Sequence, residues 1–294
     1  MKRFQLVVLL GLFSLAIAQN PIVFKDRAKN PHIVIQGNDG NLDYAEGLFE
    51  LTGNVQIKRI DEKSNVETLM TSAKATGKIT KSGGKTEIDK VRMLGGIHLT
   101  QSGKSFSTIL NGETGEYDLK GDQREVNING SVKISFEGDS TQKTSNTHSN
   151  MSATARSATV DFSTTHDANK KDVTEVQSAV IRGPIEFGGV QLVKDDTGEH
   201  IKRVIAKADE MRYTISGEEK KPEIRLMGNI EFHEVDAGDN GAMVEGGKLL
   251  VLVLNDKNEI IKLKFSAAAG TQIKSTYTKT TVKPAAGKAQ KGGA

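Results

Sequence analysis

The stretch Leu51-Thr-Gly-Asn-Val-Gln-Ile57 is the first of five copies of one phrase in this 294-residue chain. Each copy has an apolar residue, any residue, Gly, any residue, Val or Ile, any residue, then Ile, Leu or Phe. The glycines of successive copies lie 42, 35, 53 and 45 residues apart. Repetition on this scale indicates stacked units that bury their apolar faces only against their neighbours. The other copies occupy residues 93–99, 128–134, 181–187 and 226–232.

The apolar residues of each phrase recur at every second position, which is the period of a strand with one buried face. The sequence therefore predicts an inward face formed by Leu51, Val55, Ile57, Ile97, Leu99, Val132, Ile134, Ile185, Phe187, Ile230 and Phe232. The residues between them should face water, because a period of two admits no other assignment. These outward positions include Gln56, His98, Lys133, Glu186 and Glu231.

The glycine inside each phrase needs a reason, because glycine weakens the interior of a strand. Its recurrence at one position in five strands predicts a β-bulge or a sharp bend of the sheet. Such curvature lets long antiparallel strands roll up instead of lying flat. We therefore predict an all-β protein, an elongated and twisted antiparallel β-jelly roll built from repeated strand-turn-strand units.

Turn signals separate these strands along the chain. A tyrosine followed closely by glycine precedes three of the phrases, as in Tyr44-Ala-Glu-Gly47, and predicts a hairpin. Residues 203–212 carry helix formers but also fit the strand repeat, and strand is the preferred interpretation. The uniformly polar residues 139–150 predict a long exposed loop within one continuous unit over residues 19–265.

The N-terminus has the pattern of an export signal. Lys2 and Arg3 precede an uncharged stretch over residues 4–18, which ends in Ala16-Ile17-Ala18. This pattern predicts a signal peptide over residues 1–18, cleaved after Ala18, and hence an exported protein. The alternative is a retained membrane anchor. The uncharged stretch is short for that role, since spanning a bilayer takes about 20 residues.

Composition restricts the remaining possibilities. The chain has no cysteine, so it contains neither disulfides nor thiol chemistry. Residues 266–294 hold five lysines and no acidic residue, and they predict a basic, largely disordered tail. Such a tail either solubilises the terminus or touches anionic lipid. Basic residues elsewhere are dispersed and aromatic residues make up 5%, so no nucleic-acid partner is expected.

The segment from Tyr44 to Ile57 resembles the repeat of the LptA/OstA-like family of periplasmic lipopolysaccharide-transport proteins. The shared features are a tyrosine strand, a turn, a Leu-Thr-Gly-Asn-Val strand and the following residues 69–75, and the copy ending in Phe232 is also similar. The resemblance spans roughly residues 33–265. It implies a jelly roll whose two sheets enclose a groove for lipid A acyl chains, with protomers joined end to end between the inner and outer membranes. This chain is longer than the usual soluble bridge protein of that family and adds the basic tail.

No catalytic or metal-binding pattern stands out. The six histidines are scattered, and none has metal-ligand spacing to another. We therefore expect a protein that is not an enzyme and that has no cofactor or metal. Two functions stay open: a periplasmic carrier that shields lipopolysaccharide acyl chains in an apolar groove, and a structural or adhesive exported β-solenoid with a closed, dry core. Alternation cannot separate them, because groove lining and core look identical residue by residue.

The ends of an open jelly roll leave unpaired backbone groups that can accept a further strand. We expect residues 31–36 at one end and residues 260–265 at the other to pair with neighbouring molecules. Their partners would be inner- and outer-membrane transport components, or further copies of the chain joined head to tail.

Overall fold

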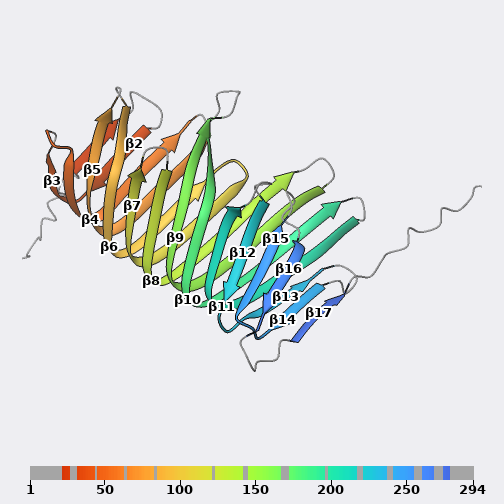
Figure 1. Ribbon diagram of the computed structural model, residues 1–294. Helices are drawn as coiled ribbons and strands as arrows, with labels where there is room; N and C mark the ends of the chain where they lie inside the picture. Colours follow the sequence, from red (N-terminus) through yellow and green to blue (C-terminus); the bar gives the residue numbers. More distant parts are fainter. Residues whose placement is uncertain are drawn as a thin grey trace, which may run out of the picture.

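The computed structural model describes residues 22–26, 32–43, 45–62, 65–82, 85–120, 123–141, 145–166, 172–195, 198–216, 221–236, 241–254, 260–267 and 274–278. The regular structure in these ranges is entirely β-strand, in one 17-stranded sheet (Figure 1). The strands are β1 (Ile22–Asp26), β2 (His32–Gly37), β3 (Asp39–Asp43), β4 (Leu48–Asp61), β5 (Val66–Ser82), β6 (Lys85–Ser102), β7 (Phe106–Lys120), β8 (Gln123–Thr141), β9 (Ser145–His166), β10 (Asp172–Asp195), β11 (Gly198–Ser216), β12 (Lys221–Met227), β13 (Glu231–Val235), β14 (Gly241–Glu245), β15 (Leu249–Leu254), β16 (Ile260–Ser266) and β17 (Lys274–Thr278). The predicted all-β fold is thus confirmed.

Strands that follow one another along the chain are antiparallel neighbours from β3 to β12. Towards the C-terminus β12 pairs with β15, which pairs with β16, while β13 pairs with β14, which pairs with β17. At the other end β2 pairs with β4 and β1 pairs with β2. Residues 203–212 lie inside β11, so the strand interpretation of that segment is confirmed.

A line of β-bulges crosses the sheet at the phrase glycines, as the sequence predicts. In β4, Gly53 and Asn54 have φ values of 69° and 51°, and the register with β5 shifts between Thr52 and Val55. Corresponding shifts occur in β6 between Leu94 and Ile97, and in β8 between Asn129 and Val132. Extra residues bend a strand locally. We call this line the crease.

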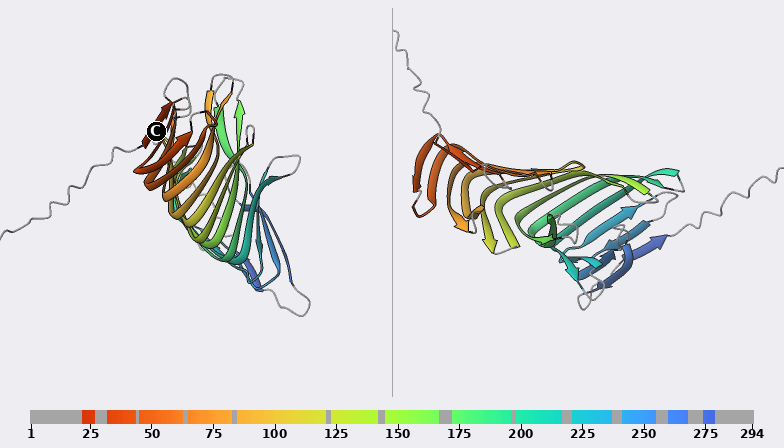
Figure 2. Two further views of the ribbon diagram at one scale, coloured as in Figure 1. Left: turned by 90° about the vertical axis from the view of Figure 1, so that its left-hand side faces the viewer. Right: turned by 90° about the horizontal axis from the view of Figure 1, so that it is seen from above.

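The crease divides each of the strands β4 to β11 into two arms, and the arms form two walls. Wall A contains β3, β12, β15 and β16 with one arm of each long strand. Wall B contains β1, β2, β13, β14 and β17 with the other arms. Figure 2 shows the result, an elongated and twisted molecule in which the bent strands make two layers facing each other. We call the space between these walls the trough.

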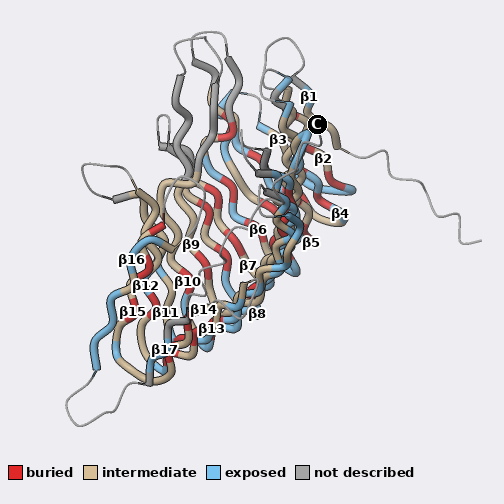
Figure 3. The backbone as a smooth tube through the Cα atoms, turned by 90° about the vertical axis from the view of Figure 1, so that its right-hand side faces the viewer, coloured by how far each residue is buried: buried red, intermediate tan, exposed pale blue. Residues whose placement is uncertain are grey.

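The core follows the inner side of both walls (Figure 3). One cluster joins residues of both walls from Ile33 in β2 to Ile185 in β10. A second cluster runs from Ala206 in β11 to Leu252 in β15. Partly buried Met211 packs against both clusters, so the apolar inner face continues along the molecule.

Three sequence-based expectations need correction. Residues 139–150 are mostly not a loop, because Asp139 pairs with His148 and Thr141 with Asn146 at the end of the β8–β9 hairpin. The expected tail of residues 266–294 contributes β17, which pairs with β14. Residues 33–36 of the expected edge strand 31–36 are not an edge, because β1 pairs with them. Polar composition indicated loop or tail in the first two cases, but cross-strand backbone hydrogen bonds do not require apolar side chains.

Residues 1–18, for which a signal peptide is predicted, and the residues beyond 278 lie outside the described residues. In the parts of the chain that are described, no helix has the length and apolar character needed to cross a bilayer.

Candidate functional site

The predicted inward residues lie on the trough side of the sheet. Nine of the eleven candidates are 8% exposed or less: Leu51, Val55, Ile57, Ile97, Leu99, Val132, Ile185, Ile230 and Phe232. The other two, Ile134 and Phe187, are partly buried. Gln56, His98, Lys133 and Glu186 are exposed, and the Glu231 side chain is 40% exposed. The predicted register is therefore confirmed.

The two walls touch beside the crease. A Cβ on Gly115, in wall A, would lie 2.7 Å from Ile97 Cδ1, in wall B. Across the same line, a Cβ on Gly112 would clash with the side chain of Ile128. Val132, next to the bulge in β8, has no exposed surface. The bottom of the trough is thus a closed, packed core.

Burial of the inner apolar residues varies along the strands. Along β8, Val132 is buried whereas Ile134 is partly buried, and along β10 Ile185 is buried whereas Phe187 is partly buried. Ile88 in β6 and Leu254 in β15 stay buried although they lie far from the crease. Phe265, on the edge strand β16, is 44% exposed. Part of the inner apolar face, in β8, in β10 and at this edge strand, is therefore not fully covered by the protein.

A cavity of about 300 Å³ lies at the N-terminal end of the trough. Its lining includes Phe24 from β1, Leu42 from β3 and Ile79 from β5. β1 belongs to wall B and β3 to wall A, so the cavity sits between the edges of the two walls. The turn residue Glu46 and the strand residue Lys78 add charge to its lining. Asp43 and Thr80 also line it, so polar and charged side chains are about as numerous as apolar ones and the cavity is not a mainly apolar ligand pocket.

The inner face of wall B also carries a polar row that sequence reasoning missed. Ser149, Gln191 and Lys202 lie opposite one another on β9, β10 and β11, and Gln191 Nε2 donates to Ser149 Oγ at 3.2 Å. Lys202 Nζ lies 2.6 Å from Oε1 of Glu234, in β13, and the side chains are 14% and 11% exposed. One step outward, His200 Nε2 is 3.3 Å from Asp236 Oδ1. We call these six residues the polar row.

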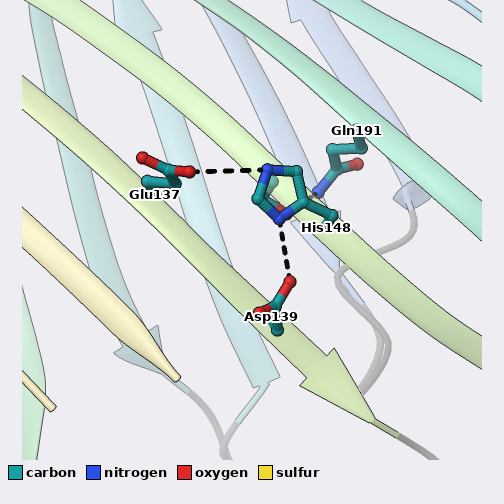
Figure 4. A network of polar contacts seen from close by, with 5 residues as sticks. Glu137, Asp139, His148 and Gln191 are labelled. Carbon is teal, nitrogen blue, oxygen red and sulfur yellow. Dashed lines mark hydrogen bonds and ion pairs between the residues drawn. The ribbon is translucent and has the colours of Figure 1, made fainter. Parts of the chain in front are cut away.

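The outer face is held by charged cross-strand pairs. Lys207 Nζ donates to Glu231 Oε2 at 2.8 Å, which lowers the pKa of Glu231 and raises that of Lys207. In both groups the hydrogen bond is the largest cause. Figure 4 shows a second outward pair, in which His148 Nδ1 lies 2.8 Å from Asp139 Oδ1 and Nε2 lies 3.8 Å from Glu137. Outward histidines such as this one are solvated surface groups.

No three His, Asp or Glu side chains within the described ranges gather in an arrangement that could hold a metal ion. Comparisons with family models, with curated proteins and with solved structures find no match to this chain.

Proposed function

We propose that this chain is a non-enzymatic periplasmic carrier that shields lipopolysaccharide acyl chains as they pass between the inner and outer membranes. The observation that carries the proposal is the trough, whose inner face carries apolar side chains along the whole sheet, some of them only partly buried. Each acyl CH₂ removed from water contributes about 0.8 kcal/mol, so a many-chained lipid needs a long apolar path. The resemblance of residues 44–57 to the LptA/OstA-like repeat supports this lipid class.

The residues proposed to contact lipid are those that the protein covers incompletely. Ile134, Phe187 and Val204 lie on the inner face and are partly buried, whereas Val55 and Val132 are packed against protein. Acyl chains would lie over the first group, and the second would form the floor beneath them. In this proposal, the strands at the ends of the walls, β1 and β3 at one end and β16 and β17 at the other, pair with transport components of each membrane or with further copies.

A second candidate is an exported structural β-solenoid with a closed core. The packing beside the crease favours it, because Ile57 and Val132 have no exposed surface and the walls touch there. The two candidates differ in what covers the partly buried inward residues, which is lipid in the first and solvent in the second.

Photo-crosslinking distinguishes the candidates. A photoreactive residue at Ile134 or at Phe187 should capture lipopolysaccharide in cells. The neighbouring outward positions, Lys133 and Glu186, serve as matched controls because each is one residue away on the opposite face. Capture at Ile134 and Phe187 alone supports the carrier. Capture at none of the four positions, or equal capture at all four, contradicts it.

A further inference from the structure

Away from the crease, the inner faces of the two walls carry different kinds of side chain. On wall A, the inner face stays apolar to the ends of β12 and β15, with Ile224, Leu252 and Leu254. On wall B, the apolar residues Ala208, Ala206 and Val204 are followed along β11 by Lys202 and His200. An amphiphile in this part of the trough would meet an apolar surface on one side and charge on the other.

The Lys202–Glu234 pair is more deeply buried than the ion pairs of the outer face. Its side chains are 14% and 11% exposed, whereas those of the outward pair Lys207–Glu231 on the same two strands are 47% and 40% exposed. Burying an ion pair costs desolvation that its attraction rarely exceeds, so such pairs are weak evidence for a stabilising role. A binding role accounts for polar side chains on an otherwise apolar inner face.

The chemistry of the row fits a phosphorylated headgroup. The Lys202 ammonium has three donors and Glu234 accepts one of them, so others are left for phosphate oxygens. His200, beside Asp236, adds a ring N–H to the row. Glu234 balances the Lys202 charge when the site is empty, and both carboxylates can accept hydroxyl groups. Gln191 extends the row by an amide towards β9.

We infer that the polar row is the subsite for the phosphate-bearing headgroup of the carried lipid, with the acyl chains directed towards the crease. This inference rests on the proposed carrier function. It adds where the lipid headgroup binds and that the headgroup must carry phosphate. Phosphorylated glycolipids and glycerophospholipids both carry the required phosphate, and the binding experiment separates them.

The test uses the full mature protein and three probes: bisphosphorylated lipid A, the same lipid A without phosphates, and phosphatidylglycerol. The inner double variant Lys202→Met with Glu234→Leu removes both charges together, so no unpaired charge is buried. Binding of the phosphorylated probes should weaken about tenfold or more, and binding of dephosphorylated lipid A should not change. Whichever phosphorylated probe binds wild type more tightly identifies the source of the phosphate.

The matched control is the outer double variant Lys207→Met with Glu231→Leu, which removes an ion pair joining the same strands on the opposite face. It should bind all probes like wild type. If the inner double variant does not fold, Lys202→Gln keeps the side chain polar and should still lose phosphate preference. An inner variant that folds and keeps that preference overturns the subsite alone. A wild-type protein that binds none of the probes overturns the carrier function as well.

Discussion

Two successive residues with left-handed backbone in four of the five phrase copies, and Gly183 alone in β10, explain the strict position of the phrase glycine. Asn54, Ser131 and Asn229 have positive φ directly after the phrase glycine, and Gly96 takes that place in β6. Left-handed backbone costs a residue with a Cβ about 1–2 kcal/mol, which glycine avoids and asparagine reduces. Asn229 also donates to both carboxylate oxygens of Asp209, at 3.1 and 2.9 Å.

β10 offers a direct comparison of two glycines. Gly183 lies at the crease with φ 100°, and an added Cβ would lie 2.5 Å from Arg156 Cβ. Gly188, further along the strand, has open space at that position. Gly183→Ala should lower the free energy of unfolding by about 1–3 kcal/mol, whereas Gly188→Ala should be neutral or slightly stabilising. Chemical denaturation of both variants measures this, and equal effects would contradict the role of the crease.

At the scale of elements, the outer ion pairs tie neighbouring strands together. Lys207 on β11 and Glu231 on β13 are opposite each other in register. The ion pair supplements the backbone pairing there, where β12 and β13 are separate strands on either side of Gly228 and each pairs with β11 over a short segment.

This pair predicts a pH dependence. The pKa of Glu231 is lowered from 4.5, so its stabilising effect is complete above that value and is lost as pH falls through the lower, folded-state pKa. The pKa of Lys207 is raised from 10.5, so its effect is lost only at still higher pH. Thermal melts should show Glu231→Gln below wild type at neutral pH and equal to it in strong acid. Lys207→Gln should behave in the same way, and a pH-independent difference would contradict the assignment.

At the scale of the whole molecule, each strand packs mainly on its sequence neighbours, as in repeat proteins. Stability in such chains is approximately a sum of local contributions. The two core clusters, joined through Met211, should therefore open as separate units.

Matched truncations in the two clusters test this independence. Leu51 in β4 and Leu250 in β15 are 2% and 0% exposed. Each Leu→Ala change should cost about 2–5 kcal/mol within its own cluster. Hydrogen exchange should speed up in β11 to β15 for Leu250→Ala and in β4 to β7 for Leu51→Ala. Uniform loss of protection along the chain in either variant would show a single cooperative unit instead.

The sequence by itself determined the strands that carry the phrase, their inward and outward faces and the bulges. These features depend on local causes, namely the period of two and the backbone freedom of glycine. The buried residues just after the phrase glycine, such as Val55 and Val132, could therefore be predicted from spacing alone.

Only the tertiary structure decided which inward residues are covered and which edges are free. Val132 and Ile134 have the same pattern in sequence, yet one is buried and the other is only partly buried, because cover depends on which distant strands pack over each residue. Ser149, Gln191, Lys202 and Glu234 form one row only because four strands align in register. Likewise, β1 covers β2 and β17 covers β14 through backbone hydrogen bonds that side-chain composition does not reveal. The cover of the inward residues, the polar row and the covered edges all depend on contacts between residues far apart in the sequence, which local periodicity does not predict.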